Sequence, residues 1–210
     1  VFQALENAIS GQVDEGNVGG GTGMVCHRFK GGIGTASRIM ANGYTLGVLV
    51  QANYGRREDL TIAGVRVGDR ITGSEIMMHG LEPANSGHSI VVIIATDAPL
   101  LPHQLKRIAR RSSLGIGRTG GFGANSSGDL FLAFSTASIG APSEKGEHQV
   151  RMLPNNQVDA FFQATIQCVE ESVINAMVAA KTMVGINDNT VYELPKVQVL
   201  GILEKHRIIE

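Results

Sequence analysis

Hydrophobic residues recur at every second position in several segments, the pattern of β-strands. In residues 44–52 the alternating apolar side chains fall on one face of the predicted strand. Residues 89–96 are almost all apolar and mostly β-branched, so we expect a strand buried on both faces of its sheet. Further strands are predicted at 24–30, 33–39, 129–135 and 197–203. Gly31 and Gly32 stand between the first two of these and predict a hairpin turn.

Apolar residues at helical spacing predict three helices, at residues 1–10, 102–116 and 157–184. The second begins with Pro102, a residue suited to the first turn of a helix. The third is long and carries one apolar stripe. The members of that stripe are Phe162, Ile166, Val169, Val173, Met177 and Val184. Residues 55–88 are charged and rich in glycine, which favours irregular structure with one short strand at most.

The composition indicates one folded domain. The chain has 210 residues, of which 43% are hydrophobic and 18% charged, enough for a full core. Its 18 Lys and Arg nearly balance 19 Asp and Glu, so neither nucleic acid nor an anionic membrane is indicated as a partner. There is no apolar run of about 18 residues to span a membrane. Cys26 and Cys168 stand far apart without a metal-binding pattern, and we expect no metal or other cofactor.

The chain starts with Val1 rather than Met, and its first residues show no signal-peptide pattern. We therefore expect the chain to be N-terminally incomplete, the continuation of a longer precursor. Two isolated thiols suit a reducing compartment but are also compatible with the periplasm. The sequence thus predicts a cytoplasmic or periplasmic protein.

The segment from Gly120 to Asp129, Gly-Gly-Phe-Gly-Ala-Asn-Ser-Ser-Gly-Asp, carries the most informative chemistry. Its glycines permit backbone conformations that strain the peptide bond before a serine. The Ser126 hydroxyl could then attack the Asn125 carbonyl, and hydrolysis of the resulting ester would expose a new N-terminal amine. With an ordinary pKa of about 7.7–8.0, that amine can serve as a general base for its own hydroxyl. From these residues alone, an ordinary glycine turn remains the stronger interpretation.

Long motifs in a fixed order change that balance. They occupy residues 15–23, 30–38, 46–53, 95–107, 125–135 and 170–176. Together they resemble the family of L-aminopeptidase D-esterase/amidases and β-peptidyl aminopeptidases, which are self-processing serine peptidases with an N-terminal nucleophile. The resemblance implies an αββα sandwich like that of N-terminal-nucleophile hydrolases but with different connectivity.

The resemblance also implies a division of the chain at the bond between Asn125 and Ser126. Residues 1–125 would form the C-terminal part of an α chain and residues 126–210 the β chain, within one domain. Ser126 would be the nucleophile. Processed αβ units of this kind are expected to assemble into a homo-oligomer.

The resemblance implies further site residues at the positions of this chain that match the family's motifs. Relatives use a Ser-x-Glu pair on the long helix, where this chain has Cys168-Val-Glu170, or Val-Glu-Glu171 in the other register. Helical geometry places Glu170 beside the apolar stripe and Glu171 away from it, so Glu170 ranks first for orienting the Ser126 amine. Asn53 and the N–H groups of residues 20–23 are candidate donors to an oxyanion. The alternative for Asn53 is a structural role as a turn-forming residue at the end of a strand. The alternative for Glu170 and Glu171 is a solvated helix face without a catalytic role.

We therefore expect a self-processing aminopeptidase or amidase. It would release N-terminal residues from short peptides, amides or esters through an acyl-enzyme on Ser126. A related N-acyltransferase using the same covalent intermediate is one alternative. A catalytically inactive oligomer subunit that retains the fold is the other, since sulfur replaces the expected hydroxyl at Cys168.

Overall fold

A four-stranded sheet forms the centre of the molecule in the computed structural model, which describes residues 1–73, 89–137, 146–147 and 149–208. Its strands, in spatial order, are β3 (Gly32–Ile39), β4 (Thr45–Asn53), β7 (Ser89–Thr96) and β8 (Leu130–Ser135). Neighbours run antiparallel except β7 and β8, which are parallel. The strands predicted at 33–39, 44–52, 89–96 and 129–135 are confirmed.

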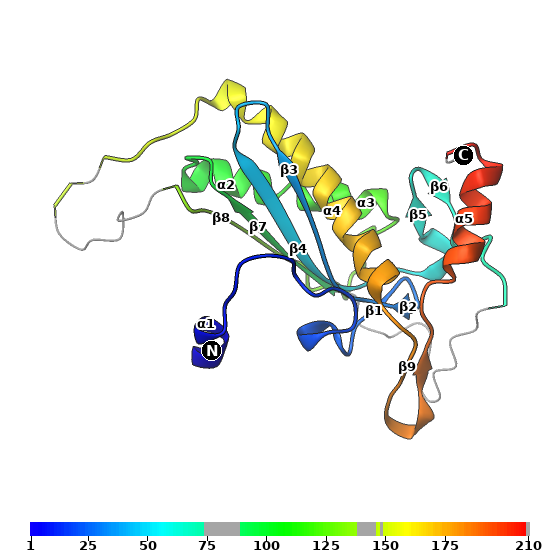
Figure 1. Cartoon of the computed structure of the whole chain (residues 1–210). Coiled ribbons are helices and arrows are strands. Elements are labelled where there is room, and N and C mark those ends of the chain that lie inside the picture. The colour runs from blue at the N-terminus through cyan, green and yellow to red at the C-terminus, as the bar shows by residue number, and fades with distance from the viewer. Residues whose placement is uncertain (74–88, 138–145, 148, 209–210) are drawn as a thin grey trace.

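The long helix α4 (Asp159–Ala179) covers one face of this sheet, lying along β3 and β4 (Figure 1). Every second residue of β4, from Leu46 to Ala52, is buried on this face. Gly34 of β3 lets the helix approach closely, because a Cβ there would lie 1.9 Å from the backbone oxygen of Ser172. The core of the protein is therefore the layer between α4 and the sheet.

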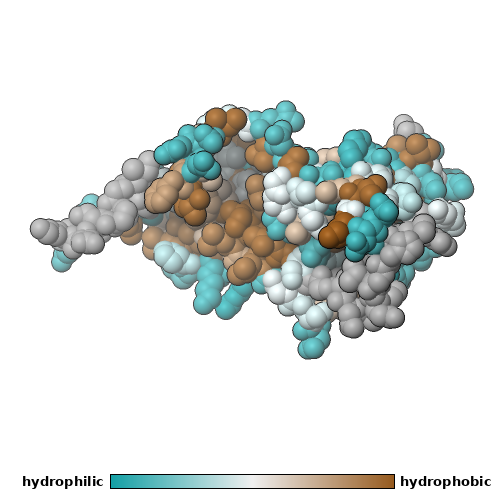
Figure 2. Space-filling view, turned by 90° about the horizontal axis from the view of Figure 1, so that it is seen from below, coloured by the Kyte–Doolittle hydropathy of each residue, from teal (hydrophilic) through white to brown (hydrophobic). Residues whose placement is uncertain are grey.

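The other face of the sheet remains partly open among the described residues. Leu130, Leu132 and Phe134 of β8 point to it and are 66%, 56% and 41% exposed. In β7 burial alternates, so the prediction of a strand buried on both faces is wrong for the described chain. Figure 2 shows a broad apolar area on the underside, in the half of the molecule that carries the sheet. In the described part of the chain, no second large sheet covers this face.

A short hairpin, β1 (Val25–Cys26) and β2 (Phe29–Lys30), stands where a longer strand was predicted. Its turn is made by His27 and Arg28, which both have positive φ. The predicted hairpin at Gly31 and Gly32 is therefore wrong, and β3 pairs with β4 instead. The glycine pair marks the passage from one small sheet to the large one.

The shorter helices differ from the predicted ones in their bounds. The predicted 102–116 helix is divided into α2 (Pro102–Ala109) and α3 (Ser112–Arg118), and α4 ends before Val184. Residues 197–203 belong to the helix α5 (Lys196–Lys205), so the predicted last strand is wrong. Their buried members Val199 and Leu203 are four residues apart, as a helix requires. Short apolar runs of this kind fit either structure.

Small elements complete the described chain. They are α1 (Phe2–Glu6), β5 (Thr61–Ile62), β6 (Val65–Arg66), β9 (Met183–Val184) and β10 (Thr190–Val191). Single 3₁₀ turns occur at Gly19–Gly21, Arg57–Asp59, Asn155–Gln157 and Ile186–Asp188. The irregular structure predicted for 55–73 is confirmed apart from two short strands, and residues 74–88 lie outside the described chain. None of the described helices is long and apolar enough to cross a membrane.

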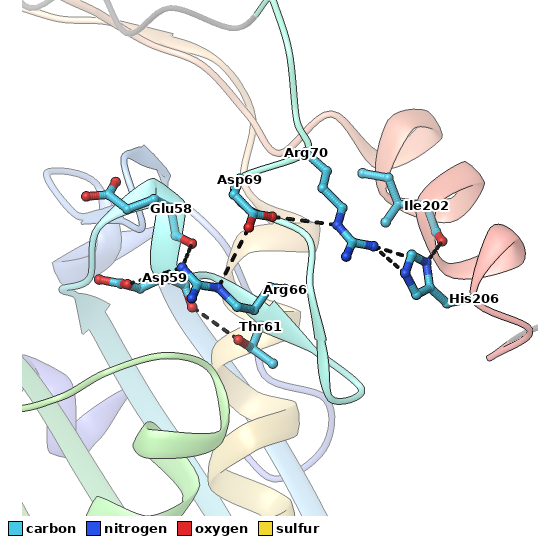
Figure 3. A network of polar contacts seen from close by, with 8 residues as sticks. All are labelled: Glu58, Asp59, Thr61, Arg66, Asp69, Arg70, Ile202 and His206. Atoms are coloured by element: carbon cyan, nitrogen blue, oxygen red, sulfur yellow. Dashed lines mark hydrogen bonds and ion pairs between the residues drawn. The ribbon is translucent and has the colours of Figure 1, made fainter.

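The arm formed by β5 and β6 is held to the C-terminal helix by a polar network (Figure 3). Arg70 contacts the carboxylate of Asp69 at 3.8 Å and the imidazole of His206, whose Nδ1 lies 2.9 Å from the carbonyl oxygen of Ile202. Arg66 donates to the carbonyl of Glu58 at 2.9 Å. These exposed contacts contribute little energy individually. The contact between Arg70 and His206 joins this segment to the end of α5.

Candidate active site

The bond between Asn125 and Ser126 lies in the middle of an exposed turn. The turn is closed by the N–H of Ser127, which donates to the carbonyl of Ala124 at 2.8 Å. The Ser127 hydroxyl donates to the Asp129 carboxylate at 2.6 Å, whereas no described residue hydrogen-bonds the Ser126 hydroxyl. Of the two adjacent serines, Ser126 thus has the hydroxyl that can turn towards the preceding carbonyl.

A water-sized cavity adjoins this turn. Its volume is about 20 Å³, enough for one water molecule. Polar groups of Arg56, Ser127 and Asp129 line it, together with the rings of Tyr54 and Phe122. The Arg56 guanidinium lies over the Phe122 ring, 5.2 Å from its centroid, in a cation–π contact. The turn therefore has polar groups beside it that could bind the water needed to hydrolyse an ester.

The loop leading to the turn is held by contacts with Tyr54 and with residues 59–61. Gly120 has φ of +97°, and a Cβ there would lie 1.8 Å from the backbone oxygen of Asp59. The buried Tyr54 and Thr119 hydroxyls are 2.5 Å apart, and burial raises the pKa of Tyr54 well above its ordinary value. The Thr119 carbonyl also accepts from the N–H of Thr61 at 3.1 Å. This anchoring limits the conformations open to residues 120–125.

We expect Gly120→Ala to destabilise the protein by about 3 kcal/mol or more, since positive φ and steric overlap act together. Gly123 is the matched control, because it also has positive φ (+65°) but nothing lies within 4 Å of a Cβ. Gly123→Ala should cost only about 1 kcal/mol. Chemical unfolding of both variants tests this difference. Equal losses would show that contact with Asp59 does not constrain the loop.

Asn53 and the cleavage segment meet at the same end of the sheet. Asn53 is the last residue of β4 and pairs with Ser89, the first residue of β7. Ser89 accepts the N–H of Gly128 at 3.1 Å through its hydroxyl. Both residues lie on the face of the sheet opposite α4, according to the alternation of burial. The structure therefore brings Asn53 together with the segment that contains Ser126.

The side-chain amide of Asn53 has a defined orientation. Its Oδ1 accepts the backbone N–H of Val25 at 2.9 Å, which ties β1 to the end of β4. The Nδ2 group, with its two N–H donors, is thereby directed away from Val25. The glycine turn Gly19–Gly21 lies alongside, where a Cβ on Gly20 would meet the Gln51 side chain 2.4 Å away. Donation by the Asn53 amide to an oxyanion stays a prediction.

Glu170 and Glu171 are not brought to this end of the sheet. Glu170 is paired with Arg118 at 3.0 Å and Glu171 with Arg38 at 2.5 Å. Both glutamates belong to α4, on the opposite face of the sheet from Ser89 and Gly128. The Glu170 side chain is 20% exposed and that of Glu171 is 44% exposed, as helical geometry predicts. An orienting role for either carboxylate stays a prediction.

Cys168 is fully buried on α4, within the core. Burial raises the pKa of its thiol to about 11, partly opposed by Arg38. The thiol is therefore protonated at neutral pH and is a poor nucleophile. The described residues contain no group of three or more His, Cys, Asp or Glu side chains placed to bind a metal ion.

We expect Glu170→Gln to lower kcat by less than about tenfold, because the carboxylate already has a cationic partner on the α4 side of the sheet. A residue that took part in proton transfer would contribute about 10²-fold or more. Arg118→Ala is the control, since it breaks the same ion pair from the other side. A 10²-fold reduction of kcat by Glu170→Gln alone would contradict this expectation and support the orienting role predicted from the sequence.

Comparison with known proteins decides the family. Residues 1–191 match the model of peptidase family S58. The chain belongs to peptidase family S58. Among its S58 relatives is a β-peptidyl aminopeptidase, BapA, of Sphingosinicella microcystinivorans, which is 44% identical over 98% of this chain and 55% of the relative. The chain spans about half the length of the curated relatives it matches.

Solved structures of S58 relatives confirm the fold class. A β-aminopeptidase of a Burkholderia species has 46% identity and a TM-score of 0.85, over 97% of this chain and 57% of that one. The L-aminopeptidase D-Ala-esterase/amidase of Ochrobactrum anthropi has 45% identity and a TM-score of 0.84, over 98% and 56% of the two chains. It is described as a prototype for the serine aminopeptidases and a new variant of the Ntn hydrolase fold. The mixed α/β architecture and the family resemblance read from the sequence are thus confirmed.

Proposed function

We propose that the full-length protein containing this chain is an aminopeptidase or amidase that first cuts itself between Asn125 and Ser126. Beyond membership of family S58, one observation supports this proposal. The bond lies in an exposed turn, held to the same sheet end as the Asn53 amide. Neither an acyltransferase nor an inactive subunit is favoured by a specific contact among the described residues.

Self-cleavage would begin when the Ser126 Oγ attacks the carbonyl carbon of Asn125. The C–O bond forms as the C–N bond breaks, and the departing Ser126 nitrogen takes up the hydroxyl proton. Water then hydrolyses the ester, which leaves a carboxylate on Asn125 and regenerates the Ser126 hydroxyl. The product is a β chain that begins with a free amine beside its own nucleophile.

In turnover, the neutral Ser126 amine accepts the proton of its hydroxyl as Oγ attacks the substrate carbonyl. The proton is passed to the leaving amine or alcohol, and the acyl group remains on Ser126. Water attacks this ester and releases the free acid. The Asn53 amide would donate to the negatively charged oxygen in both tetrahedral intermediates.

Short peptides and the amides or esters of amino acids are the proposed substrates, since S58 relatives are named for such activities. Processed αβ units are proposed to assemble into a homo-oligomer, in the cytoplasm or the periplasm. A panel of p-nitroanilides and amides of α- and β-amino acids, in L and D forms, tests the activity. We expect the purified protein to release product from at least one of them. A processed protein inert towards the whole panel would contradict the proposal.

A further inference from the structure

Lys30 carries a buried ammonium group at the same end of the molecule as Asn53. The residue is 2% exposed, and its Nζ donates to three backbone carbonyls, those of Met24, Gly31 at 3.1 Å and Gly21 at 3.4 Å. An isolated buried charge is costly, and such hydrogen bonds compensate it. Burial lowers the pKa of Lys30 to about 8, opposed by Cys26 nearby. The ammonium is therefore mostly protonated at neutral pH.

The thiol of Cys26 does not neutralise this charge. It is fully buried, and burial raises its pKa to about 12, so it stays protonated at neutral pH. Acidic side chains are absent from the contacts of the Lys30 ammonium in the described chain. The positive charge thus acts on the three peptide groups it contacts.

One of these peptide groups connects Lys30 to Asn53. The Met24 carbonyl, which accepts from Nζ, shares a planar peptide unit with the N–H of Val25. That N–H donates to Oδ1 of Asn53 at 2.9 Å. Hydrogen bonds in such a chain polarise one another, so a cation at one end strengthens the donor at the other. The effect here is to make the Asn53 Nδ2–H groups more positive.

A second contact acts on the adjoining turn. The Gly21 carbonyl accepts from Lys30 and also from the N–H of Met24 at 3.1 Å. Lys30 thereby holds both ends of the turn from Gly21 to Met24. The position of Val25, and with it the orientation of Asn53, depends on this turn.

We propose that Lys30 is a positioning residue for the hydrolytic reaction. It orients and polarises the Asn53 side-chain amide through the peptide between Met24 and Val25, so that Nδ2 binds the oxyanion. This inference rests on the proposed function, which assigns the oxyanion to Asn53. A purely structural lysine would instead satisfy three buried carbonyls and affect only folding.

A double-mutant cycle between Lys30 and Asn53 separates these two roles. We expect Lys30→Met in the full-length protein to lower kcat by about 10- to 100-fold with KM changed less than threefold, as for a residue acting in the transition state. In an Asn53→Ala background the same substitution should lower kcat by less than threefold. The self-cleavage rate is the readout wherever a variant remains uncut.

Controls make the cycle decisive. Cys26→Ala alters the same buried environment but leaves the hydrogen bonds from Lys30 through the Met24–Val25 peptide to Asn53 in place. This variant should keep kcat within threefold. If Lys30→Met does not fold, Lys30→Gln replaces it, because its amide retains N–H donors without the charge. If Lys30→Met reduced kcat by the same factor in the parent and in the Asn53→Ala background, the proposed role of Lys30 would be overturned while the proposed function would stand. If Asn53→Ala alone left kcat unchanged, the assignment of Asn53 as oxyanion donor would be overturned, and with it the role of Lys30.

Discussion

Ser126→Ala leaves the full-length protein as one uncut chain without measurable hydrolase activity. This result is expected because a single hydroxyl serves both the attack on the Asn125 carbonyl and the later attack on substrate. The variant should fold normally, since Ser126 is exposed and no described residue hydrogen-bonds its hydroxyl. Electrophoresis of the purified variant and assays with amino-acid p-nitroanilides measure the two effects.

Ser127→Ala provides the matched control for this experiment. Its hydroxyl donates to Asp129 at 2.6 Å and is already engaged, so the variant should still process and retain measurable activity. The comparison also fixes the register, because two adjacent serines could each be the cleavage point. Two results would contradict the assignment of Ser126 as the nucleophile. One is a fragment beginning at residue 126 in Ser126→Ala, and the other is loss of cleavage in Ser127→Ala alone.

Asn53→Ala is expected to lower kcat by about 10²- to 10³-fold, the effect typical of removing one oxyanion donor. The change in KM should be small, because the interaction develops in the transition state. Self-cleavage should slow as well, since its tetrahedral intermediate forms at the same end of the sheet. Steady-state kinetics on the processed fraction and the time course of self-cleavage provide the two measurements.

Asn53→Asp distinguishes catalysis from structure at this position. An aspartate keeps an oxygen that can accept the Val25 N–H, so β1 should stay attached to β4. It has no N–H donor and adds a negative charge, so the loss of kcat should be at least as large as with alanine. If Asn53→Asp kept kcat within tenfold of the parent, Asn53 would serve only as an anchor for β1.

The alternation of apolar residues predicted β4 because this strand buries one face against α4, whereas β8 packs against α2. Local patterns failed where tertiary contacts decide between structures. Residues 197–203 form a short apolar run that was predicted to be a strand, but Val199 and Leu203 are the buried pair of a helix. The glycine pair at 31–32 suggested a turn, whereas the turn is made by His27 and Arg28.

Only those residues of the candidate site that belong to a sequence motif could be predicted from the sequence. The segment containing Ser126 and the strand end at Asn53 carry recognisable residues, and the structure places them at one end of the sheet. The role proposed for Lys30 depends on its burial and on the turn that brings its ammonium to the carbonyls of Gly21 and Met24, and no sequence pattern reveals either. Helical geometry ranked the exposure of Glu170 correctly, but which face of the sheet its helix covers required the fold.

The central claim is that the protein cuts itself immediately before Ser126, and the mass of the purified full-length wild-type protein tests it most directly. Intact-mass spectrometry under denaturing conditions, combined with N-terminal sequencing of the smaller species, gives both the cleavage and its position. The account predicts two chains, the second of which begins Ser-Ser-Gly-Asp from residue 126. A single intact chain, or a second chain that begins at Ser127, would contradict it.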